Sequence, residues 1–301
     1  MNSIPINELH TDPAQFLGLD VYAVAGNPIA HSKSPLIHQR FAAQSKQAVH
    51  YGRLQPAIGE FASVAKSFFA SGGKGMNVTV PFKLDAQGFA DILTSRAQLA
   101  GAVNTLWTEK GKIYGDNTDG AGLVRDLLAQ GIQIRGASIL LLGAGGAARG
   151  VMGPLLDQGP AQLIVVNRSS PKAEQLVSVF AGLAKIKGVQ LEVRTLLELE
   201  DHVMTTKVFD LVINATAAGL NDESPLTTSA VNNVLAPSSF AYDMVYGKNT
   251  AFMQQALLRG ARVSDGLGML VEQAADAFLI WRGADLHDSI DSRAVLSELR
   301  S

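Results

Sequence analysis

Apolar residues along this chain follow two patterns that take turns. Short apolar runs bounded by turn residues predict strands, and apolar residues at helical spacing predict amphipathic helices. In the first part of the chain, the pattern predicts strands at residues 21–25, 49–54 and 76–80, and helices at residues 35–44, 58–70 and from residue 82 onward. Strands that alternate with helices favour a mainly parallel sheet covered on both faces.

The same alternation resumes in the second half. It predicts strands at residues 138–142, 163–166, 191–194, 211–214 and 240–245, and helices at residues 147–158 and 269–281. Between the two series, residues 102–107 and 112–114 predict a β-hairpin, and Asp119 precedes a predicted helix over residues 120–130. Residues 1–18 lack clear periodicity and predict a poorly ordered arm. The fold class is therefore α/β.

Length and composition limit the class of protein. The 301 residues suffice for about two ordinary domains, and 47% hydrophobic against 17% charged residues indicates a buried core rather than disorder. A formal net charge of −2 gives no basic footprint for nucleic acid, and the lack of cysteine excludes disulfides and thiolate catalysis. No signal peptide is recognisable, and the apolar stretch 136–148 is too short and glycine-rich to span a bilayer. We therefore expect a soluble, cytoplasmic protein with no nucleic-acid or membrane partner.

Residues 75–83, Gly-Met-Asn-Val-Thr-Val-Pro-Phe-Lys, combine a strand pattern with polar groups and a lysine. Side chains alternate across a strand, so Asn77 and Thr79 are predicted to share one face. Pro81 suits a strand end or a first helical turn, which places Lys83 in that turn. A cation there opposes the helix dipole and costs roughly 0.3–1 kcal/mol. Because stability alone would favour an acid, the segment is typical of an active site.

Residues 143–148, Gly-Ala-Gly-Gly-Ala-Ala, fit the pattern G-x-G-x-x-A between an apolar strand and a helix. In that context the glycines let the backbone approach a pyrophosphate, whose charge the helix N-terminus favours. The alternative is a tight turn that binds nothing. The candidate cofactor-binding residues in this loop are Gly143, Ala144, Gly145, Gly146 and Ala147.

The next predicted strand ends without the acidic residue that usually holds the ribose of NAD. Asn167, Arg168 and Ser169 stand there instead, and Lys172 follows within reach. A guanidinium can fork onto a 2′-phosphate, which a carboxylate would repel. These residues therefore favour NADP over NAD, although Arg168 and Lys172 could also be solvated surface charges.

Further polar residues have both a structural and a functional interpretation. Ser34 fits the N-cap of a helix with Pro35 at its first position, but Ser32 is not explained by capping, and the two hydroxyls could hold a small carboxylate. Asn104 lies inside an apolar strand, Asp119 fits a helix cap, and Gln273 on the last long helix could be a surface residue.

The six histidines show no metal-ligand spacing, so no metal site is predicted. No nucleophile elbow or Walker loop is present, which leaves hydrolase and kinase functions without support.

Taken together, these motifs resemble those of the shikimate dehydrogenases, which interconvert 3-dehydroshikimate and shikimate with NADP(H). The matching motifs, in chain order, are Ser32-Lys-Ser34-Pro, Asn77-Val-Thr79-x-Pro-Phe-Lys83, Ala100-Gly-Ala-Val-Asn104-Thr, Gly115-Asp-Asn-Thr-Asp119-Gly, Gly143-Ala-Gly-Gly-Ala, Asn167-Arg168, Asn214-Ala-Thr216, and Gly266-Leu-Gly-Met-Leu with Gln273. They run in family order from about residue 20 to the C-terminus.

The resemblance implies two domains around a cleft: a substrate-binding domain of residues 1–118 and 267–301, and a Rossmann-like NADP domain of residues 119–266. The implied substrate contacts are Ser32, Ser34, Asn77, Thr79, Lys83, Asn104, Asp119, Tyr246 and Gln273. Lys83 and Asp119 would form the proton-transfer pair, and Thr216, Met244 and Gly266 would add cofactor contacts. The implied partners are NADP(H) and shikimate or 3-dehydroshikimate, bound by a monomer or homodimer in the pathway to chorismate and aromatic amino acids.

The chain departs from the family pattern in three places. Ser169 stands where a threonine is usual, Ala217-Ala218 replaces a serine-containing pair, and the segment after Tyr246 is short and lacks a proline. Two alternatives stay open: a quinate/shikimate dehydrogenase that uses NAD, and a non-catalytic NADP-binding sensor on the same fold. Arg168 argues against the first, and the presence of both Lys83 and Asp119 argues against the second.

Overall fold

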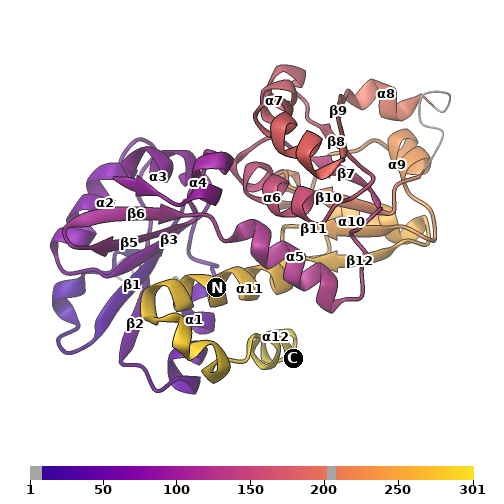
Figure 1. Cartoon of the computed structure of the whole chain (residues 1–301). Helices are drawn as coiled ribbons and strands as arrows, with labels where there is room; N and C mark the ends of the chain where they lie inside the picture. Colours follow the sequence, from indigo (N-terminus) through magenta and orange to yellow (C-terminus); the bar gives the residue numbers. More distant parts are fainter. Residues whose placement is uncertain (1–8, 202–207) are drawn as a thin grey trace. The chain divides into compact units, whose positions relative to one another are not determined.

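The computed structural model describes residues 9–201 and 208–301, and the chain divides into two compact α/β units (Figure 1). Unit 1 consists of Met1–Gly122 and Leu270–Ser301, and unit 2 of Leu123–Met269. Both chain crossings fall inside helices, α5 (Asp119–Ala129) and α11 (Leu267–Arg282). Among the described residues, each unit has one six-stranded sheet.

The sheet of unit 1 is mixed, with the strand order β2-β1-β3-β5-β6-β4. Its strands are β1 (Asp20–Ala25), β2 (Val49–Leu54), β3 (Gly75–Val78), β4 (Ile92–Leu93), β5 (Thr105–Glu109) and β6 (Lys112–Asp116). β1 is parallel to β2 and β3, whereas β5 is antiparallel to both β3 and β6. In the β5–β6 hairpin, the end of β6 lies beside the start of β5, and the start of β5 pairs with the end of β3. Polar residues at or next to these three strand ends therefore meet at one edge of the sheet.

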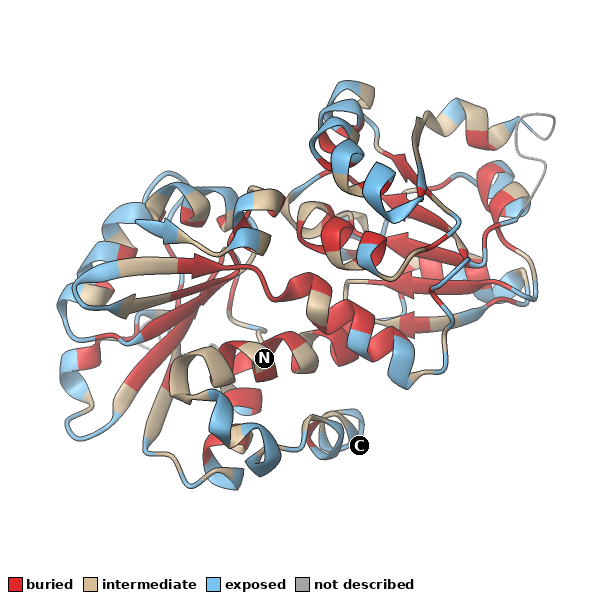
Figure 2. Ribbon diagram, viewed as in Figure 1, coloured by how far each residue is buried: buried red, intermediate tan, exposed pale blue. Residues whose placement is uncertain are grey.

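Helices cover both faces of this sheet. They are α1 (Ser34–Gln44), α2 (Phe61–Ala70), α3 (Lys83–Phe89), α4 (Ser95–Ala100), α11 and α12 (Ser292–Arg300), with 3₁₀ segments at Pro13–Gln15 and Ala284–Ser289. Alternate residues of β1 point to opposite faces: Val21 and Ala23 pack with residues of α2 and α3, and Tyr22 and Val24 pack with Tyr51. A further apolar cluster joins α1 to α11 and α12. The central strands β1 and β3 are therefore buried along nearly their whole length, whereas the other strands of this sheet are partly exposed (Figure 2).

Unit 2 is a doubly wound domain with an all-parallel sheet. Its strands are β7 (Ser138–Leu142), β8 (Gln162–Val166), β9 (Gln190–Arg194), β10 (Leu211–Asn214), β11 (Phe240–Asp243) and β12 (Arg262–Asp265). The spatial order β9-β8-β7-β10-β11-β12 reverses direction between β7 and β10. In such sheets, ligands bind beyond the carboxyl ends of the strands at this switch point.

The helices of unit 2 are α5, α6 (Gly146–Asp157), α7 (Ser170–Lys187), α8 (Leu196–Glu200), α9 (Thr228–Val234) and α10 (Ala251–Leu258), with a 3₁₀ turn at Ala218–Asn221. The central strands are continuous apolar runs because helices cover both faces of a parallel sheet. Residues 139–142 of β7 and all of β10 are buried.

Three predictions from the sequence are wrong in detail. β3 ends at Val78 rather than residue 80, because the chain turns and the Phe82 N–H donates to the Thr79 carbonyl. Thr79 therefore lies beyond the strand, and strand alternation does not place it beside Asn77. Ser34 is not the N-cap of α1: the helix begins at Ser34, and the Ser32 hydroxyl accepts the Ser34 N–H at 3.3 Å.

The predicted disorder of residues 1–18 is also wrong for residues 9–18. Thr11 exchanges hydrogen bonds with Arg53, and the Phe16 ring stacks on His50, so this part of the arm packs against β2. Residues 1–8 lie outside the described residues. The sequence patterns also missed β12 and the helices α8, α9 and α10, which complete the doubly wound unit.

Candidate active site

Lys83 and Asp119 form an ion pair in unit 1. Lys83 is the first residue of α3, Asp119 is the first residue of α5, and Nζ lies 2.5 Å from the Asp119 Oδ2. Their side chains are 13% and 5% exposed, so the pair is largely screened from water. The other oxygen of the Asp119 carboxylate accepts a hydrogen bond from Asn104. The carboxylate accepts no N–H of its own helix, so the prediction that Asp119 caps this helix is wrong. Lys83 has two further ammonium hydrogens without a partner among the described residues, which it could donate to a ligand.

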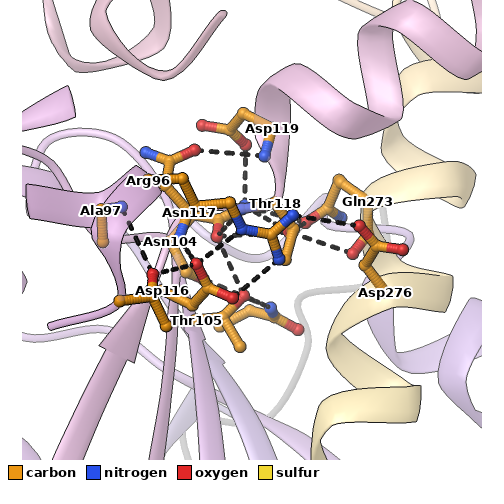
Figure 3. Close-up of polar contacts among 12 residues, drawn as sticks. Arg96, Ala97, Asn104, Thr105, Asp116, Asn117, Thr118, Asp119, Gln273 and Asp276 are labelled. Atoms are coloured by element: carbon orange, nitrogen blue, oxygen red, sulfur yellow. Dashed lines mark hydrogen bonds and ion pairs between the residues drawn. The ribbon is translucent and has the colours of Figure 1, made fainter. Parts of the chain in front are cut away.

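Asn104 joins the pair to the surrounding network (Figure 3). Its Nδ2 lies 2.8 Å from the Asp119 Oδ1 and 3.1 Å from the Gln273 Oε1, and its Oδ1 accepts the Thr118 N–H at 2.9 Å. Asn104 immediately precedes β5 rather than lying inside a strand as predicted, and Gln273 belongs to α11, so one amide links separate elements. Residues far apart in the sequence thus hold the Asp119 carboxylate in one orientation.

Asn77 has no hydrogen-bonding capacity left for a ligand. Its Oδ1 accepts from the Tyr51 hydroxyl at 2.7 Å and from the His38 Nε2 at 3.1 Å. Its Nδ2 donates to the Asn104 carbonyl and the Thr105 hydroxyl, both at 3.2 Å. A side-chain amide has two donor hydrogens and two acceptor lone pairs, and all four are used. Asn77 therefore holds the Asn104 carbonyl and the Thr105 hydroxyl, and its predicted contact with a substrate stays a prediction.

His38 fixes the orientation of that amide. Burial lowers the pKa of His38 from 6.5 to about 3, against the opposing effect of the Asn77 hydrogen bond, so the ring is neutral and donates through Nε2. The donors then run in one direction, from His38 through Asn77, Thr105 and Asn104 to the Asp119 carboxylate. Because Nδ1 of His38 is buried and has no partner within residues 9–201 and 208–301, this arrangement costs about 1–3 kcal/mol. Sequence reasoning missed His38 and Tyr51, since no local motif connects them to Asn77.

Arg96 supports the loop that carries Asp119. Its guanidinium binds both oxygens of Asp116 at 2.7 Å and reaches Asp276 on α11 at 3.6 Å (Figure 3). Burial would raise the pKa of Asp116, but hydrogen bonds from Arg96 and Thr94 outweigh it and lower that pKa. The bidentate pair clamps the end of β6, three residues before Asp119, to α4. Arg96 was also missed from the sequence, although Asp116 lies within the motif of residues 115–120.

Three hydroxyls at the same edge have donors to spare. Ser32 and Ser34 flank the start of α1, and Thr79 follows β3. Neither the Ser34 nor the Thr79 hydroxyl has a hydrogen-bond partner among residues 9–201 and 208–301, and the Ser32 hydroxyl only accepts. Free O–H donors near the N-terminus of a helix suit a carboxylate or a hydroxylated ring.

In unit 2, the predicted cofactor residues all follow the carboxyl ends of strands. Gly143 follows β7, Arg168 follows β8, Thr216 follows β10, Met244 follows β11 and Gly266 follows β12. The loops after β7 and β10 touch, because a Cβ on Gly143 would lie 3.1 Å from the Ala215 carbonyl oxygen. This is the switch point at which doubly wound sheets bind dinucleotides.

The glycine loop keeps space open for a ligand. Gly143 has a φ of +115°, which a side chain would strain, so the fold itself requires this glycine. Gly145 has an ordinary φ of −82°, and a Cβ added there would meet nothing within 4 Å. Neither strain nor packing explains Gly145. The open space over it, at the N-terminus of α6, fits the approach of a pyrophosphate.

Arg168 and Lys172 are the basic residues beside this loop. Both are exposed, and within the described part of the chain neither side chain has a hydrogen bond or an ion pair. The Asn167 Nδ2 donates to the Ser169 carbonyl at 3.0 Å, which shapes the turn between β8 and α7. Uncompensated cations on that turn fit the 2′-phosphate of NADP.

Asp243 is a buried carboxylate on the other side of the switch point, and the sequence did not reveal its role. Asp243, at the end of β11, accepts from the Thr250 hydroxyl at 2.6 Å and from the Asn214 Nδ2 at 3.1 Å. Asn214 in turn accepts from both the N–H and the hydroxyl of Thr216. Burial raises the pKa of Asp243 despite these hydrogen bonds. The network holds the loop after β10, and a Cβ on Gly266 would collide with the Met244 backbone nearby.

Among the described residues, no helix is long and apolar enough to cross a membrane. No group of three or more histidine, aspartate or glutamate side chains there could hold a metal ion.

The fold and the site together define a class of protein. A doubly wound sheet with an open glycine loop, in a chain whose other α/β unit carries a lysine–carboxylate pair, is typical of a dehydrogenase of the dinucleotide-binding class.

Comparison with known proteins agrees. The family described as "Shikimate dehydrogenase substrate binding domain" matches residues 24–106, and "Shikimate / quinate 5-dehydrogenase" matches residues 126–245. The chain belongs to the shikimate dehydrogenase family.

Relatives match over nearly the whole chain. A shikimate dehydrogenase (NADP(+)) of Vibrio atlanticus is 50% identical over 94% of this chain and 97% of its own. The crystal structure of an Ael1 enzyme from Pseudomonas putida is 42% identical, with a TM-score of 0.79 over 93% of this chain and 98% of that one. The shikimate 5-dehydrogenase of Thermus thermophilus, solved with NADP(H) and shikimate, is 31% identical, with a TM-score of 0.75 over 88% of this chain and 94% of that one.

Proposed function

We propose that this chain is an NADP-dependent shikimate dehydrogenase that reversibly reduces 3-dehydroshikimate to shikimate. The reaction belongs to the biosynthesis of chorismate and the aromatic amino acids. Family membership supports the reaction class, and the relatives at about half identity carry the same activity in their names. The observation that carries the proposal for this chain is the shielded Lys83–Asp119 pair, surrounded by groups that suit a polyhydroxylated ring.

Lys83 is the proposed proton donor and acceptor. Reduction of a ring ketone needs a hydride, which NADPH supplies when bound, and a proton at the oxygen. The Lys83 ammonium is held at 2.5 Å by Asp119 and keeps hydrogens free to donate to that oxygen. In the reverse direction the neutral amine takes the proton from the substrate hydroxyl. Asp119 orients the Lys83 side chain and compensates its charge whenever it is an ammonium.

The remaining groups of unit 1 bind and orient the substrate. Ser32 and Ser34 are proposed to hold the carboxylate, and Thr79 and Gln273 to hold ring hydroxyls. The Asn104 amide already donates to Asp119 and Gln273 and accepts from Thr118 and Thr105, so its contact with a ring hydroxyl stays a prediction from the family motif. We assign Asn77 a supporting role, because its amide is already fully hydrogen-bonded. Tyr246 has a partner elsewhere in the chain, and its contact with the substrate carboxylate stays a prediction from the family motif.

The carboxyl edge of unit 2 is the proposed NADP site. The loop of Gly143 to Ala147 would receive the pyrophosphate, and Arg168 with Lys172 the 2′-phosphate. The openness above Gly145 and the uncompensated charge of Arg168 support this assignment. The other proposed cofactor contacts are Asn167, Ser169, Thr216, Met244 and Gly266.

A spectrophotometric assay tests the function. The purified chain with shikimate and NADP should produce NADPH absorbance, whereas NAD with shikimate, or quinate with NADP, should react much more slowly. Comparable rates with NAD or quinate would favour the quinate/shikimate alternative. No turnover with any combination of these substrates and cofactors would point to the non-catalytic sensor.

The proposal extends to where and in what form the enzyme works. We place it in the cytoplasm, together with the biosynthetic pathway that it serves, as a monomer or homodimer. Light scattering during size-exclusion chromatography distinguishes 31.8 kDa from twice that mass.

A further inference from the structure

The carboxylate end of the proposed substrate site has a cation that no motif pointed to. Arg53 is the fifth residue of β2, and its Nη2 donates to the Ser32 carbonyl at 2.9 Å. Ser32 is one of the two serines assigned to the substrate carboxylate. The guanidinium therefore contacts the backbone of the segment that carries this hydroxyl.

The register of the sheet places Arg53 on the face that carries the site. Arg53 is paired with Val24, and Val24 is paired with Asn77, in two parallel ladders. Residues paired across parallel strands point to the same face, so Arg53 and Asn77 rise from one face, two strand spacings apart. Tyr51, two residues earlier on β2, donates to Asn77 and confirms the direction of this face.

The charge of Arg53 has no partner carboxylate among the described residues. Its Nε is buried without a hydrogen-bond partner, and no carboxylate in the described part of the chain lies within ion-pair distance of its guanidinium. A half-buried cation with one hydrogen bond to a neutral carbonyl is costly for the folded protein, because water no longer solvates it fully. An anion bound beside Ser32 would relieve that cost.

The other groups of the site do not supply this charge. Ser32, Ser34 and Thr79 are neutral donors, and the Lys83 ammonium is already neutralised by Asp119 at 2.5 Å. Lys33, between the two serines, also has no side-chain partner among the described residues, but it belongs to the partly exposed turn before α1 rather than to the sheet. It is the natural control for a general effect of positive charge.

We propose that Arg53 is a specificity-determining residue that selects substrates carrying a carboxylate, by countercharge and by holding the Ser32 segment. The proposal rests on the proposed function and names what makes its carboxylate subsite selective. Arg53 takes no part in proton or hydride transfer, so it should act on kcat/KM through substrate binding and leave kcat nearly unchanged.

The test compares shikimate with its methyl ester, which keeps the ring and hydroxyls but has no charge. In Arg53→Gln, kcat/KM for shikimate should fall roughly tenfold, as expected of one unit charge a few ångströms away at intermediate dielectric, while kcat/KM for the ester changes little. Arg53→Lys should retain most of the preference for the acid. Lys33→Gln should leave the ratio of acid to ester close to that of the wild type. Where ester turnover is too slow to record, calorimetric binding of both compounds gives the same ratio.

Each result decides the matter. An equal loss for acid and ester in Arg53→Gln means that Arg53 only holds the loop, and overturns the proposal. An equal loss of selectivity in Lys33→Gln assigns the effect to general positive charge and also overturns it. Wild-type chain with no shikimate activity overturns the proposed function itself, an outcome that appears before any variant is compared. Thermal melting of each variant shows whether the fold survives, and Arg53→Lys serves if the glutamine variant does not fold.

Discussion

The polar edge of the sheet in unit 1 and the carboxyl edge of the sheet in unit 2 are built in opposite ways. Around Asp119, the side chains satisfy one another: Asn77 uses all its hydrogen-bonding positions, and Asn104 links Asp119 to Gln273. Around the glycine loop, the Arg168 side chain has no partner in the described part of the chain and Gly145 faces open space. The first region is organised before any ligand arrives, and the second is left incomplete for one.

This difference follows from what each region is proposed to do. Proton transfer needs a donor held in one orientation, so a buried network is of use even though its members are costly to bury. A dinucleotide brings its own charges, and the protein needs only glycine backbone and free cations to receive it. Substitutions in unit 1 should therefore change rates or stability, whereas substitution of Arg168 or Gly145 at the edge of unit 2 should change cofactor affinity without changing stability.

The largest expected effect is on Lys83. Lys83→Ala should lower kcat for shikimate oxidation by roughly 100- to 10,000-fold, the usual contribution of a positioned acid–base group, with little change in KM. Steady-state kinetics with saturating NADP measures both constants. A greatly raised KM with kcat preserved would make Lys83 a binding residue. Lys74→Ala is a matched control, because this lysine immediately precedes β3 and has no side-chain partner among the described residues.

The next largest effect is expected for Arg168, at the carboxyl edge of unit 2. Hydrogen bonds to charged groups are worth about 1.5–3 kcal/mol, so Arg168→Ala should weaken NADP binding roughly 10- to 150-fold. NAD, which lacks the 2′-phosphate, should bind nearly as before. Titration of both cofactors by protein fluorescence measures this. Lys185→Ala, near the far end of α7, is the control for lost positive charge. An equal loss for NAD and NADP would contradict the assignment of the 2′-phosphate to Arg168.

Substitutions of Gly143 and Gly145 should affect two different properties, the stability of the fold and the binding of NADP. Gly143→Ala places a side chain at φ +115° and should lower the free energy of unfolding by about 1–3 kcal/mol. Gly145→Ala keeps an allowed φ of −82° and open surroundings, so its melting temperature should match the wild type. Its methyl group should nonetheless weaken NADP binding, by an overlap worth roughly 1–3 kcal/mol. If Gly145→Ala bound NADP normally, the pyrophosphate would not approach that glycine.

The sequence predicted the two regions unequally well, for a physical reason. Apolar strands buried on both faces have a strong local pattern, and the predicted bounds of β2, β7 and β10 are confirmed. The glycine loop is also local, so its place between β7 and α6 is confirmed. β12 was missed because Arg262 and Asp265 break its apolar pattern at both ends.

The network of unit 1 could be predicted only in part. The motifs located Lys83, Asn104 and Asp119, which the structure brings together. They did not reveal the partners of Asn77, because His38 and Tyr51 lie 39 and 26 positions away in the chain. Whether an amide is already saturated depends on tertiary packing, and a linear pattern of polar residues does not contain that information.

The pH dependence of stability tests how His38 supports this network. Burial lowers the pKa of His38 to about 3, while an unfolded chain has a histidine pKa near 6.5. Between these values the unfolded state binds a proton that the folded state refuses, so the free energy of unfolding falls as the pH drops, by at most about 1.4 kcal/mol per pH unit. His38→Phe keeps a ring against Tyr51 and should remove this part of the pH dependence.

Tyr51→Phe is the matched control for that measurement. It removes the other donor to the Asn77 Oδ1 but keeps His38, so it should lower stability at every pH and leave the slope of the wild type. His50, whose pKa burial also lowers, is present in both variants and contributes equally. Urea unfolding at pH 7, 6, 5 and 4 measures the slopes. A slope unchanged in His38→Phe would mean that His38 accepts a proton in the folded protein, and the one-directional chain of donors ending at Asp119 would then have to be abandoned.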